Sequence, residues 1–156
     1  MLKARYTLFE DIQYSLREGF KKINPDVPFV YVKNGTDAPS KEDMPVLHLI
    51  DELTDFEQLS KLRETMQVKI QYKVGIFARD PMELTKLQGE LAHYFMFEVD
   101  TPIVQLSTGR IVGTLDMKPS FMSIEYMREV NRESENYHRT MMVDVTVNLH
   151  KHLGGN

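Results

Sequence analysis

The sequence predicts an α+β fold in which two helices pack on one face of a mainly antiparallel or mixed β-sheet. Three observations predict it. Apolar residues recur at helical spacing in two segments, they alternate with polar residues in two other long segments, and turn signals separate the segments from one another. A chain of 156 residues lies in the size range of one domain, and no linker or repeat divides it. We therefore expect a single domain over residues 1–156.

The first helix is expected from about residue 7 to residue 24. Its apolar residues recur every three or four positions and form one stripe: Leu8, Ile12, Leu16, Phe20 and Ile23. Thr7 and Glu10 have the spacing of a capping box, and Asn24-Pro25 is a stop signal. The sequence therefore predicts both ends of this helix as well as its buried face.

Two short strands and an acidic stretch are expected next. Residues 28–33 (PFVYVK) are rich in strand formers and run into the turn signal Asn34-Gly35, after which we expect an exposed loop to about residue 44. Residues 45–50 (PVLHLI) predict a second strand. Residues 51–64 are acidic and mixed, with no consistent period, so no element is predicted there.

The clearest local signals lie in the middle of the chain. Residues 66–78 alternate between apolar and mostly polar side chains, which predicts a long strand with one buried face. Asp80-Pro81 then forms an N-cap and first-turn pair, with Glu83 at the third helical position. The second helix should bury Leu84, Leu87, Leu91, Tyr94 and Phe95.

The last third of the chain predicts a hairpin and a long final strand. Residues 101–106 and 110–117 flank the turn signal Ser107-Thr108-Gly109. Residues 137–150 alternate as regularly as residues 66–78 do, and the tail after them is expected to fray. Between hairpin and final strand we expect an exposed loop over 118–136, in which residues 121–127 are either a strand or an exposed apolar segment and residues 128–136 are a charged loop.

Composition excludes several functional classes. The formal net charge of -4 argues against a dedicated nucleic-acid-binding protein, and the absence of cysteine removes disulfides and thiolate chemistry. The start MLKARYTLFED does not resemble a signal peptide and no stretch is apolar enough to span a bilayer, so we expect synthesis in the cytoplasm and no membrane partner.

The sequence shows no recognisable active site, and we predict a protein that is not an enzyme and holds no cofactor or metal. The glycines are scattered, so no phosphate-binding loop is predicted. The enzyme alternative is a small active site assembled from scattered residues near His48, Asp51 and His93.

A methionine-rich stretch is the candidate protein interface. Met and aromatic side chains adapt to irregular surfaces and are enriched in interfaces, although the same residues can simply fill a core. The candidate interface residues are Met117, Phe121, Met122, Tyr126, Met127 and Met142.

The order of elements resembles the tail terminator and tail-completion proteins, the head-tail joining proteins, of long-tailed bacteriophages. The resemblance is carried by the strand QVKIQYKVGIFARD running into the helix PMELTKLQGELAHYF, and by the final strand YHRTMMVDVTVNLHK. It covers nearly the whole chain as an order of elements, without an invariant motif. Residues 119–136 exceed the simplest family pattern, which leaves another neck or tail-tube component as the alternative.

The resemblance implies a structural virion protein of the tail or neck. Such proteins form homo-oligomeric rings, typically hexamers, that cap the tail tube, end its polymerisation and join it to the head connector. The implied partners are therefore other copies of this chain, the tail tube protein and a head connector or neck protein. DNA would pass through the ring without specific binding, which suits a mildly acidic protein.

Overall fold

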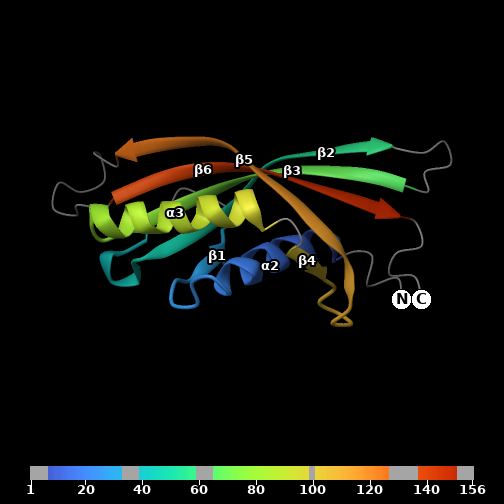
Figure 1. The fold of residues 1–156 in the computed structure, drawn as a ribbon, viewed down its shortest axis with the longest axis horizontal. Coiled ribbons are helices and arrows are strands. Elements are labelled where there is room, and N and C mark those ends of the chain that lie inside the picture. Colours follow the sequence, from blue (N-terminus) through green and yellow to red (C-terminus); the bar gives the residue numbers. More distant parts are fainter. Residues whose placement is uncertain (1–6, 33–38, 59–64, 99–100, 127–136, 151–156) are drawn as a thin grey trace.

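The structure is a computed structural model that describes residues 7–32, 39–58, 65–98, 101–126 and 137–150. Two helices, one short 3-10 turn and six strands follow one another in these residues (Figure 1). They are α2 (Leu8–Lys21), β1 (Phe29–Tyr31), η1 (Lys41–Asp43), β2 (Val46–Gln58), β3 (Thr65–Ala78), α3 (Pro81–Phe97), β4 (Thr101–Val104), β5 (Ile111–Tyr126) and β6 (Tyr137–His150).

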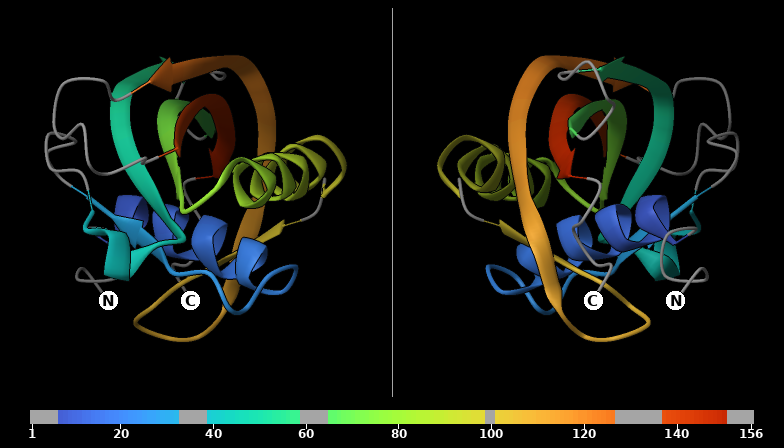
Figure 2. Two further views of the ribbon diagram at one scale, coloured as in Figure 1. Left: turned by 90° about the vertical axis from the view of Figure 1, so that its left-hand side faces the viewer. Right: turned by 90° about the vertical axis from the view of Figure 1, so that its right-hand side faces the viewer.

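The six strands form one curled sheet in the order β1-β2-β3-β6-β5-β4. Only β1 and β2 are parallel, and every other neighbouring pair is antiparallel. Figure 2 shows the sheet as an arch with both helices on its concave side. We call this side the helix face and the opposite side the outer face. The predicted α+β class, with two helices on one face of a mainly antiparallel sheet, is confirmed.

Helix α2 closes the arch because it contacts strands at both ends of the sheet, β1 on one side and β4 on the other (Figure 2). Its polar side chains bind backbone groups of these strands and of the turn that follows β4. The hydroxyl of Ser15 accepts a hydrogen bond from the Val104 N–H at 2.8 Å, and the Asp11 carboxylate accepts one from the Leu106 N–H at 3.0 Å. On the other side, the Arg17 guanidinium donates to the Phe29 carbonyl at 3.4 Å. Both ends of the sheet are thus fastened to one helix.

Asp11 and Ser15 are buried, at 2% and 3% exposure, although they lie on a helix whose core stripe is apolar. Burial of such groups costs free energy unless they are hydrogen-bonded, and here each one accepts a backbone N–H of the sheet end. The two residues therefore belong to the core as much as their apolar neighbours do.

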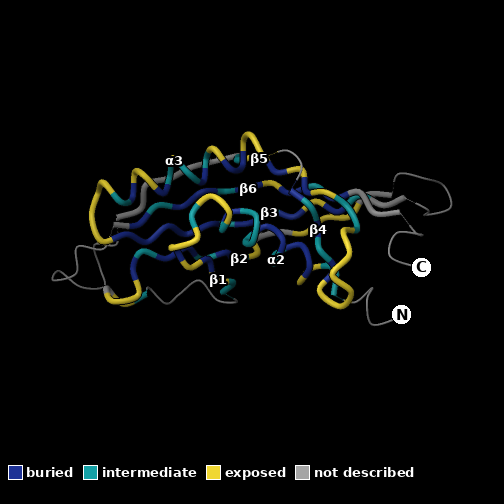
Figure 3. The backbone as a smooth tube through the Cα atoms, turned by 60° about the horizontal axis from the view of Figure 1, so that its bottom comes forward, coloured by how far each residue is buried: buried dark blue, intermediate teal, exposed yellow. Residues whose placement is uncertain are grey.

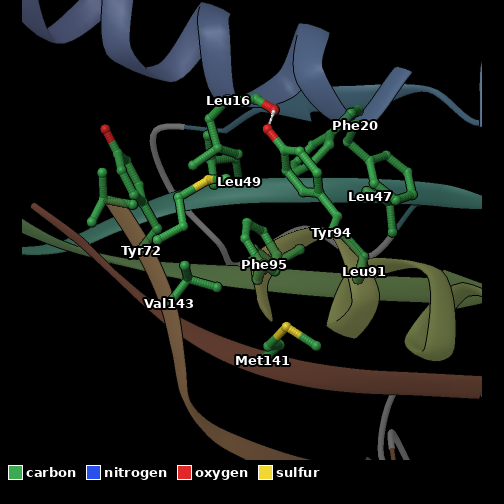
Figure 4. Packing of buried hydrophobic residues seen from close by; sticks show 14 of the residues in the cluster. Leu16, Phe20, Leu47, Leu49, Tyr72, Leu91, Tyr94, Phe95, Met141 and Val143 are labelled. Carbon is green, nitrogen blue, oxygen red and sulfur yellow. Dashed lines mark hydrogen bonds between the residues drawn. The ribbon is translucent and has the colours of Figure 1, made fainter. Parts of the chain in front are cut away.

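Helix α3 packs on β3, β5 and β6 through the predicted stripe, all of whose members are buried. Its Tyr94 reaches across the core and donates a hydrogen bond from its hydroxyl to the Leu16 carbonyl of α2 at 2.8 Å (Figure 4). The rings of Tyr94 and Phe20 also meet edge to face, with centroids 5.9 Å apart. Figure 3 shows the buried inner strands and the exposed outer side of α3. One core thus joins both helices to the sheet.

Most predicted elements are confirmed within one to three residues. The strands predicted at 66–78 and 137–150 are β3 and β6, and the N-cap of α3 is Asp80, whose carboxylate accepts from the Glu83 N–H at 2.8 Å. The hairpin between β4 and β5 is present, and its Gly109 has a φ of 71°, a conformation that glycine adopts without strain.

Three predictions were wrong in part. Strand β2 continues to Gln58 through the acidic stretch, because a bulge between Asp51 and Leu53 resets the alternation and β3 supplies pairing partners. Strand β5 runs to Tyr126, so residues 118–126 are not a loop. Of the two predicted possibilities for residues 121–126, a strand or an exposed apolar segment, the strand is observed. Thr7 does not cap α2 with its side chain, which donates to the Asp11 carboxylate at 3.2 Å instead. Residues 127–136, 33–38 and 151–156 lie outside the described residues.

A methyl group at Gly19 would overlap the buried Tyr94 hydroxyl, which gives a first prediction. Gly19→Ala should destabilise the fold by about 1 to 3 kcal/mol, because overpacking outweighs the gain in helix propensity. In a Tyr94→Phe background the same substitution should cost clearly less, since the overlapping oxygen is gone. Chemical denaturation of the four proteins in this cycle measures the coupling.

The matched control is Gly89→Ala on α3, because the added methyl group would meet no atom within 4 Å beyond its chain neighbours and the backbone of its own helix. That substitution should stabilise the protein by about 0.5 to 1 kcal/mol through helix propensity alone. Equal effects of Gly19→Ala in the two backgrounds would contradict the predicted contact.

The hydrogen bond between β4 and the Ser15 hydroxyl of α2 leads to a second prediction. Ser15→Ala should cost about 1 to 3 kcal/mol, because the Val104 N–H loses its acceptor. Ser40→Ala is the control, since Ser40 is exposed and its hydroxyl donates only to Asp43. It should change stability by less than about 0.5 kcal/mol. Hydrogen exchange should also become faster at the Val104 amide in Ser15→Ala, and an unchanged rate there would contradict the assignment.

Candidate interface: a ribbon with two open edges

Parts of β2, β3 and β6 continue beyond the strands that flank them and form a three-stranded ribbon. It comprises residues 53–58 of β2, 65–71 of β3 and 144–150 of β6, paired in register throughout. At its base, residues 144–146 of β6 still pair with β5. Figure 1 shows these strand ends projecting at one end of the molecule, away from α3. The ribbon is the part of the sheet that the helices cover least.

Within the described part of the chain, each side of the ribbon ends in an open strand edge. β1 pairs with β2 only at residues 47–49, and β5 pairs with β6 only as far as Asp116 opposite Thr146. Beyond these points no strand of the described residues pairs with residues 52–58, which we call the β2 edge, or with residues 147–150, which we call the β6 edge. Open edges present unpaired N–H and C=O groups, which other strands can bind.

The outer face of the ribbon is polar. Asp55 lies opposite Lys69, and the Gln71 side-chain amide donates to the Asp144 carboxylate at 3.2 Å. Such exposed cross-strand pairs contribute little to stability, but they keep this face soluble. The helix face of the ribbon is apolar at its base, where Ile70 and Val145 are buried.

Further along the helix face, Phe56 is 57% exposed and its ring meets that of Phe9 of α2 edge to face, at a centroid distance of 6.1 Å. Leu106 and Ile111 of the adjacent hairpin are also exposed, at 46% and 68%. Leu106 lies beside the start of α2, because its N–H binds Asp11. Exposed large apolar side chains on different elements thus lie around the start of α2.

A polar cluster lies where the ribbon leaves the body. The Tyr31 hydroxyl donates to the Asp51 carboxylate at 2.6 Å, and Asp51 is the register partner of the buried Tyr72. The hydrogen bond to Asp51 is the largest of the causes that raise the pKa of Tyr31 to about 12, followed by burial and the carboxylate charge. Burial, followed by the charge of Asp51, likewise raises the pKa of Tyr72. The bulge follows directly after this cluster.

The outer face of the body has a small apolar cluster of its own, formed by Met44, Val46 and Phe77. Phe77 stacks on His138 at a centroid distance of 4.3 Å, and His48 packs against the same ring at 4.9 Å. Burial lowers the pKa of His48. Met44 was expected in an exposed loop, and that prediction was wrong because its side chain fills this cluster.

The candidate interface residues divide into four groups. Met117 is 6% exposed and packs in the main core, so the core-filling interpretation holds for this residue. Met142 is half-buried at an outer-face position of β6, opposite Phe121. The backbones of Phe121, Met122 and Tyr126 pair with β6, and Met127 lies outside the described residues. Their role in an interface stays a prediction.

The residues of the enzyme alternative are not brought together. His48 lies on the outer face of the sheet against Phe77, whereas Asp51 binds Tyr31 on the helix face. His93 is exposed on α3, next to Phe97. The sheet separates the first two residues, so these three cannot share one site. Nor do His, Asp and Glu side chains gather in groups of three that could hold a metal ion in the described parts of the chain.

An open groove of about 790 Å³ lies at the other end of the molecule, between the α2–β1 turn and the start of α3. Val27, Pro45, Pro81 and Leu87 contribute apolar surface, and Met82, 84% exposed, stands at its rim. The Arg79–Glu83 ion pair, at 3.0 Å, lies at the same rim.

Neither described helix is long and apolar enough to cross a membrane.

Reasoning from sequence missed the ribbon because it missed the second half of β2. The available signal was Thr54 and Phe56, which alternate with acidic residues just as a half-buried strand does. One extra residue at the bulge hid this period, since it moved the alternation by one position.

No family model matches the chain, and no curated protein matches it either.

The Tyr31–Asp51 bond predicts a pH dependence. The folded state keeps the Tyr31 proton to about pH 12, whereas the unfolded state loses it near pH 10.0. The contribution of this bond is therefore complete below pH 10 and is lost as the pH rises toward 12. Tyr31→Phe should lose less stability than the wild type between these pH values, measured by urea denaturation.

Asp51→Asn provides the companion measurement, because it removes the carboxylate charge and keeps an acceptor. It should lower the pKa of Tyr31 toward the ordinary value, seen as tyrosinate absorbance that Tyr31→Phe lacks. A Tyr31→Phe protein with the same pH slope as the wild type would contradict the predicted shift.

Proposed function

We propose that this protein is a structural virion subunit that forms a ring, caps the phage tail tube and joins it to the head connector. The observation that carries the proposal is the ribbon, because a subunit with two open strand edges at one end can bind neighbours on both sides. The order of its elements, which resembles that of tail terminators, supports the same function.

The division of the molecule into body and ribbon supports an assembling role. The body has a continuous core from α2 to β6 that buries most of its apolar residues, although Met82 and Phe97 of α3 stay exposed. The ribbon instead exposes backbone edges and, near the start of α2, large apolar side chains such as Phe56. The exposed rings of Phe56 and Phe9 are in contact, and contiguous exposed apolar surface marks interaction sites in soluble proteins.

Charge supports a ring through which DNA passes without specific binding. The described part of β2 from residue 51 onward contains four acidic residues and no basic one, and Asp144 of β6 lies on the polar outer face of the ribbon. Phosphate binding needs clustered Lys and Arg, so an acidic ribbon would not retain DNA. The tail tube protein and a head connector protein are the proposed partners above and below the ring.

The function predicts a concentration-dependent homo-oligomer. Sedimentation velocity and light scattering over a wide range of concentrations should show conversion to one closed species, and negative-stain electron microscopy should show rings with a central opening. Added tail tubes should carry this ring at one end only. A chain that stays monomeric at every concentration and binds no tube end would refute the proposal.

A further inference from the structure

The two open edges of the ribbon are unlike each other, and we infer that they bind each other between copies. The β2 edge of one chain would pair with the β6 edge of the next chain. This inference rests on the proposed ring and names its contact surface. It is carried by three observations: the direction of the edge groups, the charges along the edges and the directions of the strands.

The backbone groups of the β2 edge can be assigned from the observed hydrogen bonds. The Leu47 N–H donates to the Pro28 carbonyl, and the Leu49 carbonyl accepts from Val32, both at 2.9 Å, so Leu47 and Leu49 face β1. Edge-facing residues alternate along a strand, and the bulge between Asp51 and Leu53 shifts the alternation by one. Thr54 and Phe56 therefore direct their N–H and C=O groups to the open side, where the Phe56 N–H donates to the carboxylate of the adjacent Asp55 at 2.9 Å and would exchange this local bond for one to a partner strand.

The same alternation assigns the β6 edge. Leu49 faces away from β3, so its register partner Val74 directs its backbone groups to Met141 of β6. Odd-numbered residues of β6 thus bind β3, and even-numbered residues face β5. Beyond Thr146, where β5 has turned away, Asn148 and His150 present their backbone groups to the open side.

Charge favours contact between unlike edges. The β2 edge, residues 52–58 (ELTDFEQ), carries three acidic residues and no basic one, whereas the β6 edge, residues 147–150 (VNLH), carries no acidic residue. Pairing of two β2 edges by a two-fold axis would bring acidic residues against acidic residues, which destabilises cross-strand contacts. Pairing of the β2 edge with the β6 edge avoids this repulsion.

The strand directions define the geometry of the contact. β2 and β6 are both antiparallel to β3, so they run in the same direction. Copies repeated by rotation about one axis therefore pair β6 with the next β2 as parallel strands. Such a contact is heterologous, and it closes into a ring when the rotation closes.

Proline substitutions at the two edges test the inference. Thr54→Pro and Asn148→Pro each remove an N–H from an open edge and leave the hydrogen bonds to β3 in place, since neither N–H faces β3. Thr54→Ala and Asn148→Ala retain the N–H groups and are the controls. Each proline variant alone should be monomeric by sedimentation, and both alanine variants should form the wild-type oligomer.

Mixing the two proline variants gives the sharper result. Thr54→Pro keeps its β6 edge and Asn148→Pro keeps its β2 edge, so an equimolar mixture should form a heterodimer and nothing larger. An Asn148→Pro homodimer would show β2–β2 pairing, and a Thr54→Pro homodimer would show β6–β6 pairing; either overturns the inference. A wild-type ring that both proline variants also form overturns it and leaves the proposed function intact. A wild-type chain that never associates overturns both.

Cysteine crosslinking supplies a test that does not depend on proline tolerance. The chain has no cysteine, and Asp55 and Asn148 lie opposite Lys69 and Gln67, two residues apart on β3. With a short bis-maleimide, the Asp55→Cys, Asn148→Cys double variant should give a ladder of covalent oligomers. Either single variant should give none, and a dimer band from a single variant, or no ladder from an associated double variant, would contradict the inference.

Discussion

The fold depends on helix α2 holding both ends of the sheet. An arch of six strands would otherwise present β1 and β4 as open ends, and both are short strands with few partners. Asp11 and Ser15 satisfy backbone N–H groups on the β4 side, and Arg17 binds a carbonyl of β1. Because this helix binds the terminal strands of the sheet at the body, the open edges that we have assigned lie on the ribbon.

The bulge in β2 has a second structural consequence. Without it, the edge-facing groups of β2 would stay on the odd-numbered residues from end to end, and Asp55 would lie on the helix face with Leu47 and Leu49. The extra residue turns Thr54 and Phe56 to the helix face of the ribbon and directs their backbone groups to the open edge. Phe56 then meets Phe9, which ties the ribbon to the start of α2.

Most of the fold could be predicted from local patterns, and the candidate interface could not. The stripe of α3 and the alternation of β3 and β6 are properties of consecutive residues, so periodicity finds them. The burial of Asp11 and Ser15 depends on a strand nearly 90 residues away, and the open edges depend on where β1 and β5 stop pairing. Met117 shows most clearly what the sequence alone cannot predict, because methionine suits a core and an interface equally. Only the packing of the folded chain shows that Met117 lies in the core.

An open strand edge favours aggregation unless something limits what can bind it, and the β2 edge has two such limits. Its acidic residues repel a second β2 edge, and the bulge interrupts the regular ladder on which an extended foreign strand would align. Neither the acidic residues nor the bulge hinders pairing with the β6 edge. That edge has only four residues and no acidic one, and in the proposed contact it would pair with β2 only beyond the bulge. The same residues that protect the ribbon from uncontrolled association would therefore select one partner edge in the proposed ring, and selection of an unlike edge by each chain is the condition for a ring to grow from identical subunits.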